Sequence, residues 1–158
     1  MLSGFKNICD INIVMAKSCL TCIEDSNDET EYEIPKWSQL MGNYSALPSV
    51  LNCEEKYNAN KVDLVGETPK LKKEHVNVSL KTKPHTWVFY WTSEPSKDPS
   101  KIIGPEEAYG DLRNRGLKQS DEEGMVILQI NCPQPYEVEG KVYPRHIHYV
   151  LLQEDKTW

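Results

Sequence analysis

The sequence predicts a mainly β protein, folded as an antiparallel β-sandwich or barrel. Several short runs rich in β-branched and aromatic residues are separated by turn-forming residues, and each run has the length of one strand. No long amphipathic helix separates these runs, as it would in a parallel α/β protein. Proline and glycine interrupt the chain in residues 92–105 and 133–140, which therefore read as loops. This combination favours strands that pair antiparallel.

The predicted strands follow in order from residue 75. Residues 75–80 alternate apolar and polar side chains and place Val76, Val78 and Leu80 on one face. Residues 86–91 are almost wholly apolar, which is typical of a central strand. Residues 106–116 are expected to form a turn of helix or coil around Tyr109. A polar turn at residues 120–124 then leads into a strand over residues 125–132, which two prolines end.

The last predicted strand, residues 142–152, carries two histidines separated by one residue. Side chains in a strand alternate between its faces, so His146 and His148 should point to the same side. Neutral imidazole binds iron, copper, zinc and nickel, and two imidazoles one strand step apart can share one ion. Histidines on strands are also often ordinary polar or core residues, so further ligands are needed to indicate a site.

The N-terminal segment, residues 1–73, differs from the rest of the chain. It lacks sustained periodicity and contains an acidic run at residues 24–33 with scattered prolines, so we expect an irregular arm or extension. A short helix near residues 36–44 is the exception, because Trp37, Leu40 and Met41 have helical spacing. The expected domains are this arm and a β-sandwich core over residues 74–158. The arm's apolar residues are expected to pack on the core or on another subunit.

Composition excludes several classes of function. The 158 residues carry a net charge of -6 and a pI near 5.3, which argues against nucleic acid or an anionic membrane as a partner. No apolar run is long enough to span a bilayer, and residues 1–20 are a poor secretory signal, so an intracellular, cytoplasmic location is expected. The five cysteines form no even disulfide framework, and the Cys19 and Cys22 pair lacks a second pair for zinc.

The second half of the chain resembles the intradiol ring-cleavage dioxygenases, the catechol and protocatechuate type, over about residues 85–152. The resemblance rests on the turn at 120–124, the strand after it, the Pro-Gln-Pro-Tyr segment ending at Tyr136, and the Pro-Arg-His-Ile-His-Tyr segment ending at Tyr149. Upstream, the strand ending at Trp91 and the loop leading to Tyr109 are also similar to that family. The resemblance implies an intradiol dioxygenase-like β-sandwich that binds non-haem Fe(III) through two tyrosines and two histidines.

Carried over by motif, the implied iron ligands are Tyr109, Tyr136, His146 and His148, with Tyr90 a weaker alternative to Tyr109. A trivalent cation would deprotonate the phenols, which otherwise titrate near pH 10. The implied reaction opens a catechol-type aromatic diol with O2, and a displaced tyrosinate, Tyr109, accepts a substrate proton. The family also has an arginine three residues before its first histidine. Tyr143 stands at that position here, and Arg145 is the nearby catalytic candidate, although a regular strand places it on the opposite face.

Two alternatives remain open. The chain is alternatively a catalytically inactive β-sandwich of the same ancestry that serves as a structural or assembly component, including one of a viral particle. In that case residues 1–73 would dock on a protein partner or mediate self-association. A cupin-like or zinc hydrolase site built on the two histidines is a third reading, with His75 and His85 as remote ligands.

Overall fold

The computed structural model describes residues 11–15, 48 and 50–158. Its elements are β1 (Asn12–Met15), α2 (Val50–Cys53), η1 (Glu55–Tyr57), β2 (His75–Lys81), β3 (Trp87–Thr92), α3 (Pro105–Tyr109), β4 (Arg115–Gln119), β5 (Met125–Asn131), β6 (Tyr136–Val138), β7 (Lys141–Tyr143) and β8 (His146–Leu151). Strands predominate and most pair antiparallel, so the prediction of a mainly β protein is confirmed.

The strands form three sheets. The largest has the order β1-β8-β3-β4, while β2 pairs with β5 and β6 pairs with β7. Every pairing between these strands is antiparallel except that of β1 with β8. β1 lies within the segment 1–73 and runs parallel to β8, with Asn12 opposite His146 and Val14 opposite His148. The strand that carries both histidines is therefore paired along both edges.

One hydrophobic cluster joins the β2–β5 pair to the four-stranded sheet. The inward residues of β5, Val126, Leu128 and Ile130, are at most 4% exposed and pack with Val88, Tyr90 and Ile147 of β3 and β8. The alternation predicted for residues 75–80 and 125–132 is what presents these apolar faces. β3 is buried on both faces, which explains why its sequence is nearly continuous in apolar residues.

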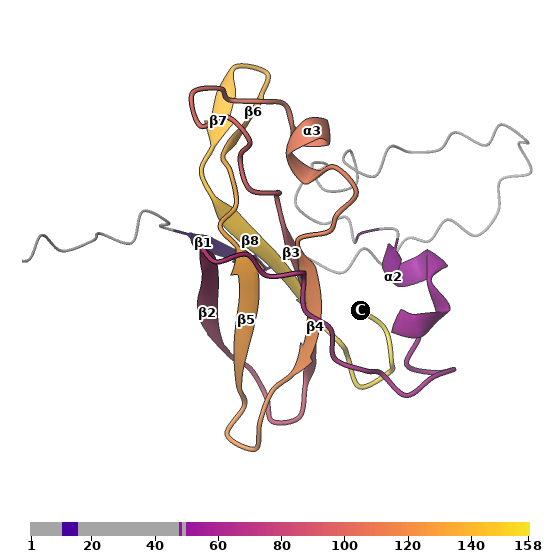
Figure 1. Cartoon of the computed structure of the whole chain (residues 1–158). Coiled ribbons are helices and arrows are strands. Elements are labelled where there is room, and N and C mark those ends of the chain that lie inside the picture. Colours follow the sequence, from indigo (N-terminus) through magenta and orange to yellow (C-terminus); the bar gives the residue numbers. More distant parts are fainter. Residues whose placement is uncertain (1–10, 16–47, 49) are drawn as a thin grey trace, which may run out of the picture.

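A second hydrophobic cluster covers the opposite face of the sheet. Phe89 and Trp91 of β3 meet α3, the α2–η1 segment and the C-terminal Trp158 there. The Trp158 Nε1–H donates to the Tyr57 carbonyl at 2.9 Å, and the C-terminus accordingly lies beside α2 in Figure 1. Val50, Leu51 and Tyr57 belong to this cluster although they lie within the segment 1–73.

Some expectations concern residues outside the described part of the chain. They are the helix near residues 36–44, the Cys19 and Cys22 pair and most of the segment 1–73. Among the described cysteines, Cys132 is disulfide-bonded and Cys53 carries a free, exposed thiol. Within the described residues, every helix is too short or too polar to cross a membrane.

Candidate functional site

Strand β8 presents both histidines to the second cluster. His146 and His148 lie on one face and are 6% and 2% exposed, while Ile147 between them points into the first cluster. Their imidazole rings lie 4.6 Å apart, centroid to centroid. The same-face arrangement that the strand period requires is therefore present. Both rings lie on the side of the sheet that meets α3, because the Tyr109 Oη lies within 3.2 Å of both Nε2 atoms.

Two tyrosines approach these histidines from outside the large sheet. Tyr109 is the last residue of α3, a helix that begins after Gly104 with Pro105 in its first turn, where the missing N–H costs nothing. The helix ends because Gly110 adopts a φ of 49°, a conformation in which glycine avoids Cβ strain. Tyr136 is the first residue of β6, directly after Pro135. The two phenol rings meet edge to face, 5.3 Å apart.

The four side chains converge within hydrogen-bonding distance, and we call them the Tyr–His cluster (Tyr109, Tyr136, His146 and His148). The Tyr109 Oη lies 3.2 Å from the His146 Nε2, 3.1 Å from the His148 Nε2 and 3.4 Å from the Tyr136 Oη. The Tyr136 Oη lies 3.2 Å from the His146 Nε2. All four residues are at most 6% exposed. Two oxygens and two nitrogens therefore share one buried point.

The protonation states of the cluster follow from its surroundings. The His146 Nδ1 lies 2.6 Å from the Pro144 carbonyl, which can only accept, so Nδ1 carries the proton and Nε2 presents a lone pair to the tyrosines. Burial lowers the pKa of His146, and burial together with the nearby His146 lowers the pKa of His148 to about 3. Burial raises the pKa of Tyr136, against a hydrogen bond from Tyr109. At neutral pH the imidazoles and the Tyr136 phenol are uncharged.

Neighbouring aromatic rings hold the cluster in place. The Trp91 indole stacks on His148 at 5.2 Å with an angle of 12° between the planes, and Tyr143 stacks on Tyr136 at 5.5 Å and 11°. Thr92 donates a buried hydrogen bond to the His146 carbonyl. Sequence reasoning did not assign these supporting roles. The sequence carried one signal for the role of Trp91: side chains alternate between the two faces along β3, so Trp91 lies on the same face as Phe89.

The Trp91 indole also leaves one hydrogen-bonding group unused. Its Nε1–H is fully buried and, among the buried side-chain nitrogen and oxygen atoms of the described residues, is the one without a hydrogen-bond partner. A buried unpaired donor costs free energy, and such groups are rare in folded proteins. It is therefore a polar group beside the Tyr–His cluster whose hydrogen-bonding capacity no described residue satisfies.

Two other candidates lie away from the cluster. Tyr90 points to the first hydrophobic cluster, where its Oη donates to the Gln129 carbonyl at 3.3 Å. Because adjacent residues of β3 face opposite sides, Tyr90 cannot replace Tyr109 as a partner of the histidines. The Arg145 Nε donates to the Pro133 carbonyl at 2.9 Å, and none of the hydrogen bonds among the described residues links Arg145 to the cluster.

The remote histidines of the zinc reading do not approach the cluster either. His75 is exposed at the start of β2, with its Nδ1 3.0 Å from the Lys72 carbonyl, and His85 is exposed in the turn before β3. In the described part of the chain, His, Cys, Asp and Glu nowhere gather in a group of three or more that could hold a metal. Any metal bound by the Tyr–His cluster would therefore depend on the phenolic oxygens.

Comparison with known proteins found no match to the chain. No protein-family model matches the chain, and neither the curated proteins nor the solved structures contain a match to it.

Proposed function

We propose that the Tyr–His cluster binds ferric iron and that the protein is an intradiol dioxygenase-like enzyme that opens catechol-type rings with O2. The convergence of two phenol oxygens and two imidazole nitrogens at 3.1–3.4 Å carries this proposal. The packing of the β2–β5 pair on the large sheet supports the accompanying proposal of a β-sandwich of the intradiol type.

The donor atoms fit such an ion. Ligands about 2 Å from a common ion lie about 2.8 to 3.3 Å apart in octahedral or tetrahedral arrangements, close to the separations found here. Phenolate is a hard oxygen donor suited to a trivalent cation, and imidazole is a general iron ligand. The bond from the His146 Nδ1 to the Pro144 carbonyl fixes the tautomer that leaves Nε2 available, as in many metal sites. Metal binding would replace the two phenol protons.

Different residues of the cluster would have different roles in the reaction. Bound ferric iron would supply the Lewis acidity that holds a doubly deprotonated catechol. Tyr109, at the end of a short helix, would accept one substrate proton, while His146 and His148 would remain neutral ligands fixed by their strand. The net reaction adds both atoms of O2 to the ring and yields a dicarboxylic acid. Arg145 would act indirectly, by fixing the Pro133 carbonyl three residues before Tyr136.

A second function is favoured by two specific observations. The cluster is at most 6% exposed, so a catechol reaches it only if part of its wall moves. Tyr143 occupies the position where the related family has arginine, and it stacks on Tyr136. A catalytically inactive β-sandwich of the same ancestry, acting as a structural or assembly component such as one of a viral particle, accounts for both. The two functions differ in turnover, not in fold.

Metal analysis combined with a visible absorption spectrum tests the iron site. Protein purified without chelators and loaded with ferric iron should hold one iron per chain and show a visible charge-transfer band from phenolate to iron. The variants Tyr136→Phe and His146→Ala should lose the band and most of the iron. Tyr149→Phe is the matched control, because Tyr149 lies on β8 but packs on the first cluster, and it should keep both.

Turnover then separates the two functions. The iron-loaded protein should consume O2 with catechol and release a ring-opened dicarboxylate, and Tyr109→Phe should slow this reaction. Iron and colour without O2 consumption would favour the structural component. Iron content and colour that do not change in Tyr136→Phe and His146→Ala would refute the iron site.

A further inference from the structure

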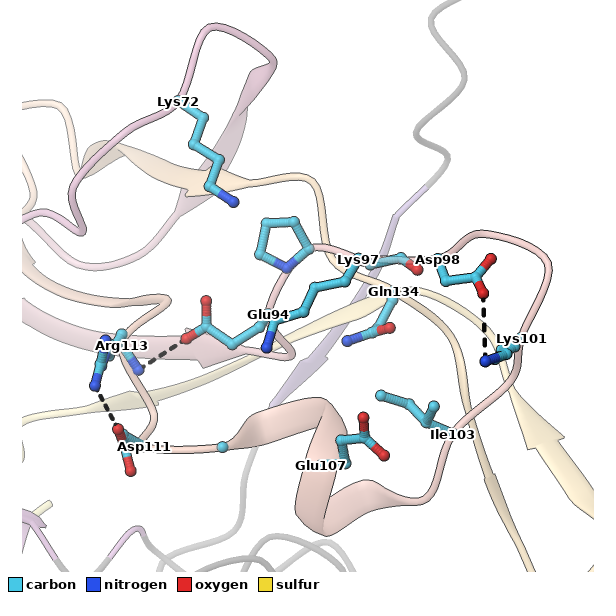
Figure 2. Close-up of a pocket in the computed structure, with 13 residues that line it drawn as sticks. Lys72, Glu94, Lys97, Asp98, Lys101, Ile103, Glu107, Asp111, Arg113 and Gln134 are labelled. Carbon is cyan, nitrogen blue, oxygen red and sulfur yellow. Dashed lines mark hydrogen bonds and ion pairs between the residues drawn. The ribbon is translucent and has the colours of Figure 1, made fainter.

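A cavity that includes no residue of the Tyr–His cluster lies beside α3. Its volume is about 560 Å³, which falls in the range of small-molecule sites. It is bounded by the loop after β3, the end of α3, Lys72 and Gln134, and no residue of the Tyr–His cluster lines it. Figure 2 shows the lining to be mainly charged and polar, so a polar ligand suits it better than an apolar one.

Most of the charges in this cavity already have partners. The Lys101 Nζ pairs with Asp98 at 3.6 Å, and the Arg113 guanidinium pairs with Asp111 at 2.6 Å. One oxygen of Glu94 accepts two backbone N–H groups, those of residues 113 and 114, each at 3.0 Å. The two ion pairs neutralise four of the lining charges, whereas the Glu94 carboxylate is bonded to backbone N–H groups and keeps its negative charge.

Three charged groups in the lining remain uncommitted. Among the described residues, the ammonium groups of Lys72 and Lys97 and the carboxylate of Glu107 form no ion pair or hydrogen bond. In Figure 2 the Lys72 side chain points down from the upper part of the view, Lys97 ends beside Glu94, and Glu107 lies on α3 in the lower part. Two positive groups and one negative group are therefore available to a ligand, in addition to the negative charge of Glu94 that the backbone N–H groups hold.

Gln134 adds an uncharged polar group to the wall of the cavity. The residue is 7% exposed and lines the cavity, yet only its backbone groups form hydrogen bonds with the described residues. Its side-chain amide is therefore available to a ligand that donates or accepts hydrogen bonds. Figure 2 shows this amide among the other side chains that line the cavity.

We infer that this cavity binds a small acidic amino acid, a molecule with two carboxylates and one ammonium group. The two carboxylates match Lys72 and Lys97, the ammonium group matches Glu107, and the Gln134 amide can bond to either kind of group. Phosphate or a simple dicarboxylate would satisfy the lysines but would leave Glu107 unpaired beside added negative charge. The arrangement therefore favours the amino acid over both.

The ligand would also brace the segments that carry the two tyrosines. Glu107 and Gly110 flank Tyr109 on α3, and the Gln134 N–H donates to the Glu94 carbonyl at 3.3 Å, two residues before Tyr136. Ligand binding requires no metal. Failure of the protein to bind iron would therefore not affect the ligand binding inferred for this cavity.

Isothermal titration calorimetry on metal-free full-length protein tests this inference with L-glutamate, glutarate and inorganic phosphate as probes. L-Glutamate should bind saturably and more tightly than glutarate, which lacks the ammonium group. The double variant K72M/K97M should weaken L-glutamate binding by about tenfold or more. K83M is the matched control, because the Lys83 side chain is 84% exposed and lies outside the cavity, and it should bind as the wild type does.

Selectivity provides the sharper readout. Glu107→Gln should remove the preference for L-glutamate over glutarate while keeping the same thermal unfolding temperature. No saturable L-glutamate binding would overturn the inference. So would equal affinity for L-glutamate, glutarate and phosphate, which would show a general anion surface instead. A preference that survives in Glu107→Gln would overturn the assigned role of Glu107.

Discussion

Acid should destabilise the metal-free protein through His148. Burial and the neighbouring His146 lower the pKa of His148 to about 3 in the folded state, whereas an exposed histidine of the unfolded chain titrates near pH 6.5. Below pH 6.5 the unfolded chain therefore takes up a proton that the folded protein does not accept until about pH 3. The stabilisation is complete above pH 6.5 and is lost progressively as the pH falls towards 3.

The size of this effect follows from how far the pKa of His148 is lowered in the folded state. Each pH unit below the unfolded pKa costs about 1.36 kcal/mol, so His148 alone should remove about 2 kcal/mol of unfolding free energy between pH 7 and pH 5. Burial lowers the pKa of His146 as well, and this adds to the loss in the same direction. A domain of this size has a total stability of about 5–15 kcal/mol, so the loss is readily measured.

Urea unfolding at pH 7, 6 and 5 in the presence of a chelator measures this dependence. His148→Gln should be less stable than the wild type at pH 7, because it loses the stacking on Trp91, yet it should lose about 2 kcal/mol less on acidification. His75→Gln, an exposed histidine on β2, should follow the wild-type pH dependence. If His148→Gln lost as much stability as the wild type between pH 7 and pH 5, burial of a neutral His148 would not be the cause.

Two further predictions concern packing, and each is measured by urea unfolding at pH 7. Gly116→Ala should destabilise the protein by about 1–3 kcal/mol, because a Cβ there would lie 2.2 Å from the Tyr90 ring. Gly104→Ala is the control, because a Cβ at Gly104 meets nothing within 4 Å. Equal losses of stability in the two variants would contradict the proposed clash. Asn114→Ala should lower the free energy of unfolding by about 2–3 kcal/mol, because it leaves the buried N–H and carbonyl of Asn131 without partners. Each of these groups lies 2.9 Å from the Asn114 amide. A loss below about 0.5 kcal/mol would contradict this role of Asn114.

The strands that the sequence predicted correctly are those whose own side chains specify them. Residues 86–91 were expected to be a central strand and correspond to β3, and the alternating residues 75–80 and 125–132 correspond to β2 and β5. β4 was missed because its sequence, Arg-Gly-Leu-Lys-Gln, has neither pattern. It is a strand because it pairs with β3, where Gly116 makes room for the Tyr90 ring. Such pairing is a property of the tertiary structure.

The candidate site was predictable in part. The period of a strand was enough to place His146 and His148 on one face, but no spacing rule brings Tyr109 or Tyr136 to them. Tyr109 depends on a helix of five residues that ends at Gly110, and Tyr136 depends on a short strand after two prolines. Only the resemblance to a family suggested these tyrosines. The structure brings them together with the histidines, whereas iron and catalysis remain predictions.

The two sides of the Tyr–His cluster differ in how firmly the fold holds them. The histidines lie on β8, which pairs with β1 on one edge and β3 on the other. The tyrosines lie on a five-residue helix and a two-stranded hairpin, and elements of these sizes are barely stable by themselves. A substrate that enters this buried cluster would therefore displace the tyrosine side at less cost than the histidine side. The proposed function would use the same asymmetry, because the histidines would hold the iron while Tyr109 would accept the substrate proton.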